Sequence, residues 1–157
     1  MLKKYTMGGW SLFFTIGLLV TSPVFLPAQT AADLQTVLES SAVTCSQAAR
    51  FVISSTGETA LSGRDAYFQQ AVEKGWLPQG TNPDDSITLG RLSFLIMRAF
   101  GIKGGLMYAI APGQRYAFRT MVSRSFIQGA ADPAMKVNGE RFLEILGKVL
   151  SAYGGET

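Results

Sequence analysis

Residues 75–101 read GWLPQGTNPDDSITLGRLSFLIMRAFG, and this stretch decides the fold more clearly than any other. Pro78 and Pro83 stand in a run of glycine, asparagine and aspartate residues that fix backbone angles or bond their own main chain, so helix cannot continue there. Helical pattern resumes at Thr88, a residue type that is favoured at the N-cap. The stretch therefore predicts the end of one helix, a fixed turn and the start of a second helix.

The second of these helices is predicted to be buried on several sides. Ile87, just before the N-cap, is spaced to pack on Leu92 as a hydrophobic staple. One apolar face with helical spacing and three further large apolar residues follow: Leu92, Leu95, Ile96 and Ala99, then Phe94, Met97 and Phe100. A helix that is apolar on most sides belongs in a protein core.

Much of this pattern returns when the sequence is shifted by 50 residues. The matching pairs are Phe68 with Phe118, Trp76 with Phe126, Pro83 with Pro133, and Ile87 with Val137. The cap recurs as Asn138, and a weaker copy lies 44 residues upstream, where Thr44 matches Thr88. We therefore predict three helix-loop-helix repeats over residues 31–57, 64–102 and 113–153, within one domain over residues 31–153.

The N-terminal residues have the layout of a secretory signal peptide. Lys3 and Lys4 precede an apolar run over residues 10–20, and small residues follow up to Ala28. We predict a signal peptide over residues 1–28, with cleavage after Ala28. An uncleaved membrane anchor is the alternative, because residues 24–26 extend the apolar zone. Either reading implies export, to the periplasm or the cell surface of a bacterium.

The composition of the domain that remains after residues 1–28 are removed limits its possible functions and the ways in which it can be stabilised. It retains 12 basic and 11 acidic residues, so it carries no basic footprint for nucleic acid. Its single cysteine, Cys45, cannot form an internal disulfide and is expected to be a small packing residue. The fold must therefore be held together by packing.

We predict an all-α fold, because no stretch alternates for long enough to indicate a strand. The expected helices cover residues 31–40, 44–55, 64–74, 88–100, 113–126 and 138–152. Residues 106–110 form an apolar connector that fits either a helical turn or a short extended segment. Each helix pair is too small to bury its own apolar face, so the three pairs are expected to share one core.

The GWLPQG turn, the PDDS stretch and the following IT with an apolar helix resemble the surface-layer homology (SLH) domain family. The resemblance is good over residues 67–102, fair over 116–153 and weak over 34–57. It implies three helix-loop-helix modules around a pseudo-threefold axis. It also implies a domain that binds cell-wall polysaccharide or a polymer linked to peptidoglycan.

The chain departs from the family at the TRAE signature, whose arginine contacts the ligand. Thr88 is followed here by Leu89, Gly90 and Arg91, so the arginine's own position holds Leu89. The copies that begin at Asn138 and Thr44 also lack the arginine. The wall-polymer site that the resemblance implies is therefore altered in this chain.

A groove for a wall glycan needs an aromatic platform, hydrogen-bonding amides and a guanidinium group. The residues close enough in sequence to supply these at one helix-turn-helix mouth are Trp76, Gln79, Asn82, Asp84, Asp85 and Arg91. Each also has a structural interpretation: Trp76 as a core residue, the aspartates as turn residues, and Arg91 as a solvated residue of the first helical turn. Arg91 is the preferred binding residue, because a cation at a helix N-terminus opposes the helix dipole.

An enzyme is not expected. The chain has no histidine, so neither a Ser-His or Cys-His pair nor a histidine-ligated metal can form, and we predict no catalytic residue, metal or other cofactor. The predicted function is a non-catalytic cell-envelope binding module for peptidoglycan or a linked wall polymer. The alternative is a periplasmic protein-protein interaction or assembly module that docks an envelope protein through Met107 and Tyr108 of the connector.

Overall fold

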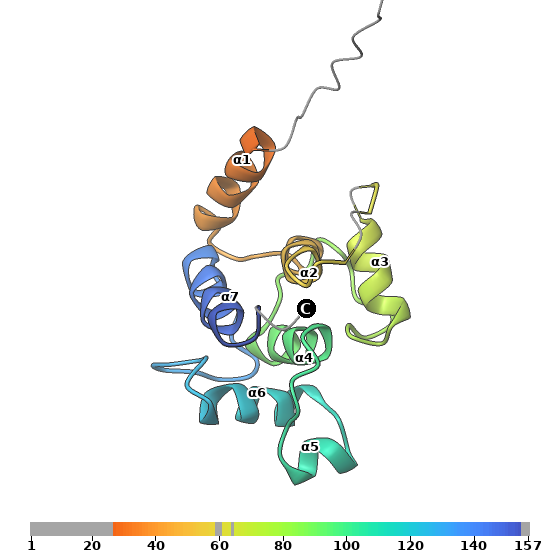
Figure 1. Cartoon of the computed structure of the whole chain (residues 1–157), viewed down its shortest axis with the longest axis vertical. Coiled ribbons are helices and arrows are strands. Elements are labelled where there is room, and N and C mark those ends of the chain that lie inside the picture. The colour runs from red at the N-terminus through yellow and green to blue at the C-terminus, as the bar shows by residue number, and fades with distance from the viewer. Residues whose placement is uncertain (1–26, 59–60, 64, 155–157) are drawn as a thin grey trace, which may run out of the picture.

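A computed structural model describes residues 27–58, 61–63 and 65–154 of the chain (Figure 1). These residues form seven helices and no strand, apart from two isolated β-bridges, which confirms the all-α prediction for this part of the chain. The predicted signal peptide lies outside the described residues except for its last two positions. Across the described ranges, no helix is both long enough and apolar enough to cross a membrane.

The helices follow the predicted order with small shifts. Their bounds are α1 Pro27–Leu38, α2 Cys45–Ser54, α3 Ala66–Glu73, α4 Leu89–Ala99, α5 Leu106–Ile110, α6 Gln114–Ser123 and α7 Gly139–Tyr153. α1 begins earlier than expected, at Pro27, because the fixed φ of proline suits the first position of a helix. The connector proves to be helical and forms α5.

Side-chain caps fix the starts of α2, α4 and α7 at the predicted residues. Thr44 Oγ1 accepts the Gln47 N–H at 3.2 Å, and Gln47 Oε1 accepts the Thr44 N–H at 3.0 Å, which completes a capping box. Thr88 and Asn138 each accept the N–H three residues ahead through a side-chain oxygen. Such caps typically contribute about 1 kcal/mol each.

Three backbone hydrogen bonds link the residues that immediately precede these caps. The N–H of Val43 donates to the Val137 carbonyl at 2.8 Å, that of Ile87 to Val43 at 2.8 Å, and that of Val137 to Ile87 at 3.1 Å. The three bonds close a ring, which we call the backbone ring, and all three residues are fully buried. The N-termini of α2, α4 and α7 therefore meet at one place in the interior.

One hydrophobic core lies beneath the backbone ring. Val52 of α2, Ile96 of α4 and Leu146 of α7 belong to the same buried cluster. Figure 1 shows α4 near the middle of the molecule, with α2, α3, α6 and α7 around it and α5 at the end opposite α1. The core thus joins segments from the whole described chain and leaves grooves between the helices at its surface.

Candidate functional site

Trp76, Gln79 and Asn82, three of the six residues predicted to bind ligand, lie in the turn between α3 and α4. Trp76 is half-buried against the core, and Lys74 Nζ lies 4.6 Å from its ring centroid. Asn82 Oδ1 accepts the Asp84 N–H at 3.0 Å, which tightens the turn. Gln79 is exposed. The contacts of Trp76 and Asn82 are therefore those of a core residue and a turn residue.

Of the other three predicted residues, Asp84 and Arg91 line different grooves. Asp84 lines a groove beside α1 and α2, whereas Arg91 lines a groove beside α6. The Asp85 carbonyl accepts the Cys45 N–H at 2.8 Å, so its backbone joins the α3–α4 turn to α2. The structure thus places Asp84 and Arg91 on different grooves, because the turn packs against α2 on one side while α4 faces α6 on the other.

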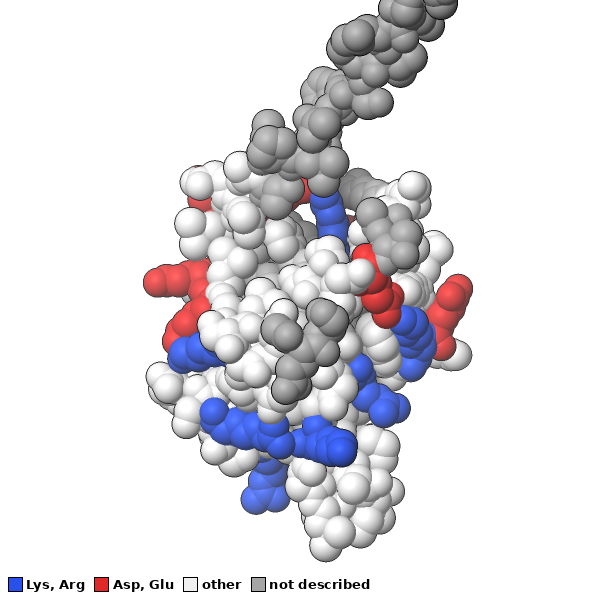
Figure 2. All heavy atoms as spheres, in the orientation of Figure 1, with Lys and Arg blue, Asp and Glu red and all other residues white. Residues whose placement is uncertain are grey.

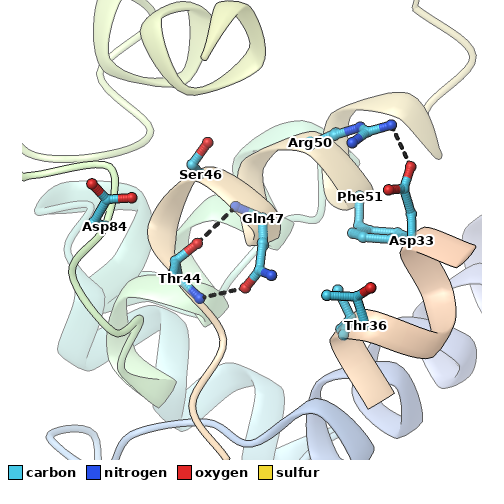
Figure 3. Close-up of a pocket in the computed structure, with 9 residues that line it drawn as sticks. Asp33, Thr36, Thr44, Ser46, Gln47, Arg50, Phe51 and Asp84 are labelled. Carbon is cyan, nitrogen blue, oxygen red and sulfur yellow. Dashed lines mark hydrogen bonds and ion pairs between the residues drawn. The ribbon is translucent and has the colours of Figure 1, made fainter. Parts of the chain in front are cut away.

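The groove beside α1 and α2, which we call the polar groove, has a volume of about 230 Å³. Its lining residues are Asp33, Thr36, Val37, Thr44, Ser46, Gln47, Arg50, Phe51 and Asp84. Figure 3 shows that the labelled side chains come from α1, from α2 with its N-cap, and from the α3–α4 turn. The polar groove is therefore built between the first helix pair and the turn of the second.

Most polar groups of the polar groove already have partners within the protein. Arg50 and Asp33 form an ion pair at 2.5 Å (Figure 3), and Ser46 Oγ donates to Asp65 at 2.9 Å. Thr44 and Gln47 are joined in the capping box. A ligand would have to break these interactions, so this groove is the weaker candidate.

The groove beside α6 is larger, with a volume of about 830 Å³, and we call it the arginine groove. The start of α4, one face of α6 and the loop before α7 line it with Thr88, Gly90, Arg91, Gln114, Arg115, Phe118, Arg119, Asp132, Pro133 and Ala134. The start of α4 and the loop before α7 meet closely, since a Cβ on Gly90 would lie 3.0 Å from the Pro133 carbonyl oxygen. The close contact holds the two walls of the groove in a fixed relation.

Three arginine side chains line the arginine groove. Among the described residues, Arg91, Arg115 and Arg119 form no ion pair. Asp132 is the acidic residue of the lining, and its Oδ1 accepts the Ala134 N–H at 2.7 Å. Three arginines and one aspartate give the groove a net positive charge. Arg115 and Arg119 lie four residues apart on α6, and such a pair of like charges mildly destabilises a helix. Such an arrangement fits an anionic ligand.

The N-terminus of α4 opens beside the arginine groove, yet its amides are already used. The Leu89 N–H donates to Met135 and the Gly90 N–H to Pro133, both at 2.9 Å. The Arg91 N–H donates to Thr88 Oγ1 at 3.4 Å. Recognition of an anion here therefore depends mainly on the guanidinium groups. The positive end of the α4 dipole adds a smaller attraction.

Charge is unevenly distributed along the chain. Residues 86–131 contain no acidic residue and six basic ones: Arg91, Arg98, Lys103, Arg115, Arg119 and Arg124. Figure 2 shows Lys and Arg side chains gathered over α6, while the Asp and Glu side chains visible on this face lie over other elements. The arginine groove is thus part of a wider positive face.

Arg91 also contacts the interior. Burial raises the pKa of the Cys45 thiol above its usual value, and the nearby Arg91 guanidinium opposes that shift only in part. The thiol therefore stays protonated at neutral pH, which fits a packing residue. Cys45 is fully buried, as expected for that role.

The two residues predicted to contact a protein partner differ in exposure. Met107 is 55% exposed on α5, whereas Tyr108 is only 8% exposed and packs edge-on against Phe94 with ring centroids 6.2 Å apart. Burial raises the pKa of the Tyr108 hydroxyl. Tyr108 therefore holds α5 to the core and presents little surface to a partner.

Sequence reasoning missed the α6 side of the arginine groove. Gln114, Arg115, Phe118 and Arg119 lie in a different helix pair from Arg91, and nothing in the local sequence indicates that they face it. The absence of acidic residues from 86–131 is the signal that could have directed attention there.

Comparison with known proteins identifies no relative of this chain: no family model, curated protein or solved structure matches it significantly.

Proposed function

We propose that this chain is a non-catalytic cell-envelope binding module that attaches to peptidoglycan or a linked anionic wall polymer through the arginine groove. The observation that carries the proposal is the meeting of Arg91, Arg115 and Arg119 in one groove, with no ion pair to any described residue. Like charges repel one another and attract counter-ions, so a cluster that no described residue neutralises favours an external anion.

The side chains of the groove suit such a polymer. Guanidinium groups bind phosphate or carboxylate through paired hydrogen bonds that are about twice as strong as neutral ones. Thr88 and Gln114 supply a hydroxyl and an amide for sugar hydroxyl and N-acetyl groups. No general acid-base pair is invoked, since binding alone accounts for these residues.

The resemblance to the SLH family is retained as part of this proposal, in the form of a degenerate three-repeat member. The backbone ring supports three repeats around a pseudo-threefold axis, because Val43, Ile87 and Val137 occupy the same position before each N-cap. Leu89, at the position of the family's ligand-binding arginine, is fully buried. The guanidinium groups of this chain would therefore reach the polymer from Arg91 and from α6.

Export is also part of the proposal, since a wall polymer is met only outside the cytoplasm. The basis is the basic, apolar and small-residue order of residues 1–28. The product would then act in the periplasm or at the cell surface of a bacterium.

Retention on purified sacculi tests the proposal. The double variant Arg115→Gln/Arg119→Gln removes two exposed cations from the groove while keeping side-chain amides in place. We expect roughly a hundredfold loss of affinity, since each charge-assisted hydrogen bond contributes about 1.5–3 kcal/mol. Retention by the wild type should also weaken as salt is raised.

A matched control is Lys74→Gln/Lys148→Gln, which lowers the net charge equally at two surface ion pairs outside the groove. This control should be retained like the wild type. Failure of the wild type to bind sacculi, while a known wall binder is retained in parallel, would contradict the proposed function. Equal losses in both variants would show that binding follows net charge and not the groove.

A further inference from the structure

The short helix α5 presents a cluster of bare apolar side chains. Leu106 is 73% exposed, Met107 55% and Ile110 69%. Three large apolar residues within one five-residue helix form an apolar projection of a kind that soluble surfaces rarely leave uncovered. We call these three residues the α5 tip.

The α5 tip is held in place by Tyr108, the one buried residue of the helix. Its ring packs edge-on against Phe94, and the backbone of Gly104 passes so close that an added Cβ there would lie 2.5 Å from the ring. The ring thus locks the helix to α4 and the preceding loop. The tip is therefore preorganised and does not collapse onto the core.

Cations flank the α5 tip on both sides. The groove on one side is lined by Leu106 and Met107 together with Arg119 and Arg124, and the Arg124 guanidinium donates to the Lys103 carbonyl at 2.6 Å. The groove on the other side is lined by Arg98 and Lys103. Neither lining contains an acidic residue. Figure 2 shows an uncharged projection at the position of α5 with blue side chains beside it.

We propose that the α5 tip docks on an anionic lipid bilayer, with Leu106, Met107 and Ile110 inserted at the headgroup level and Arg98, Lys103, Arg119 and Arg124 on lipid phosphates. Apolar side chains surrounded by basic ones are the combination that binds such an interface, because apolar burial and electrostatic attraction add. Each cation near an anionic surface raises partitioning about fivefold. A protein partner with a matching pocket would not need cations on both sides of the tip.

The shape of the molecule agrees with this orientation. α5 lies at one end of the long axis and projects from the helices around the core (Figure 1). The α5 tip can therefore meet a flat surface before the rest of the protein does. Arg119 lines both the arginine groove and the groove beside the tip, so lipid and polymer would contact adjacent parts of α6.

An environment-sensitive fluorophore on the full-length chain tests the insertion directly. Ile110→Cys carries the label at the tip, and Leu38→Cys carries it at the end of α1, away from α5, where the native side chain is 47% exposed. The native Cys45 is fully buried and should not react in the folded protein. We expect a blue shift at position 110 with vesicles containing equal parts of phosphatidylglycerol and phosphatidylcholine, and none at position 38.

No shift at position 110, or equal shifts at both positions, overturns the proposal. In the second case the N-terminal residues or nonspecific adsorption would account for the binding. Pure phosphatidylcholine vesicles should give a much smaller shift at position 110, since they offer no net negative charge. A shift of equal size there would remove the role assigned to the cations.

Unlabelled variants provide a second, independent readout by vesicle sedimentation. Leu106→Ser/Ile110→Ser should lower partitioning by about tenfold or more, because two apolar side chains no longer transfer out of water. Arg98→Gln/Lys103→Gln should lower it by a similar factor. Leu34→Ser/Leu38→Ser is the control at two other exposed apolar positions and should leave partitioning unchanged. Equal partitioning of the tip variant and the wild type contradicts insertion.

This inference and the proposed function can fail separately. Arg98 and Lys103 do not line the arginine groove, so their variant should keep its retention on sacculi. Arg115 lines the arginine groove but neither groove beside the tip, so Arg115→Gln should weaken that retention while its label at position 110 responds to the vesicles as in the wild type. Loss of a co-purified protein in the tip variant, without vesicle binding by the wild type, would assign the tip to a protein partner instead.

Discussion

Gly139, the first residue of α7, shows how tightly the ends of the chain are joined. Its N–H donates to the Ser40 carbonyl at 2.9 Å, and a Cβ added to it would lie 1.6 Å from the Val37 carbonyl oxygen. The atom in the way is backbone, which cannot rotate aside as a side chain can. The contact between α1 and α7 therefore requires glycine at this position.

Gly139→Ala should destabilise the protein by about 3 kcal/mol or more, because α1 or the start of α7 must shift to admit the methyl group. The matched control is Gly147→Ala on the same helix, where nothing lies within 4 Å of the added Cβ. That change should stabilise by up to about 1 kcal/mol, since alanine favours helix. Urea unfolding midpoints measure both effects. An unchanged midpoint for Gly139→Ala would mean that α1 does not dock on α7.

Cys45 gives the protein a dependence on alkaline pH. Its folded pKa is raised above 9.0, mainly by burial, so the folded state disfavours the thiolate. The corresponding stability is complete below pH 9.0 and is lost as the pH rises toward the folded pKa. The stability difference between wild type and Cys45→Ala should therefore shrink as pH increases through this range. A difference that stays constant or grows with pH would contradict the buried, protonated thiol.

At the level of elements, the sequence predicted the features that local signals fix, and it did not predict those that depend on contacts between distant segments. The starts of α2, α4 and α7 were predictable because each is marked by a capping side chain whose bond stays within four residues. The conformation of residues 106–110 was not predictable, because their composition suits both helix and strand; in the structure they form α5, whose one buried residue is Tyr108. The backbone ring was also not predictable. It is formed by backbone N–H and C=O groups, which every residue other than proline has, so no residue type marks it in the sequence.

The backbone ring should make its three amides the slowest to exchange with solvent. Val43, Ile87 and Val137 are fully buried, and each N–H is bonded to a different helix pair, so none can open alone. Native-state hydrogen exchange should report the global free energy of unfolding at all three. Ala109 in α5 serves as the reference, because its amide is bonded only within the exposed helix and should exchange fast. Exchange of the Val43 and Ile87 amides well before that of Val137 would show that the first helix pair opens independently, because both of those bonds involve Val43.

At the scale of the whole molecule, the fold separates residues that are close in sequence and joins residues that are distant. Asp84 and Arg91 lie in one continuous stretch, yet they line different grooves, since the turn ends against α2 and α4 then leads toward α6. Arg115 and Arg119 join Arg91 only because α4 packs against α6. Sequence could therefore single out Arg91 as a candidate binding residue but not the groove that it lines.

The distribution of charge gives the molecule a polarity that both proposals use. The six basic residues of 86–131 surround α4, α5 and α6, while most acidic residues of the described part lie on other elements. An anionic wall polymer and an anionic lipid surface would both approach this face. The two ligands differ in what they need, since the groove offers guanidinium groups and the tip offers apolar side chains.

Chemical-shift mapping with soluble fragments of an anionic wall polymer tests the assignment of the arginine groove most directly. We predict that the perturbed amides cluster around Gly90, Arg91, Gln114, Arg115 and Arg119, and that the Arg115→Gln/Arg119→Gln variant loses them. Perturbations centred on Asp33 and Arg50 in the polar groove, or none at fragment concentrations that saturate a known wall binder, would contradict the account.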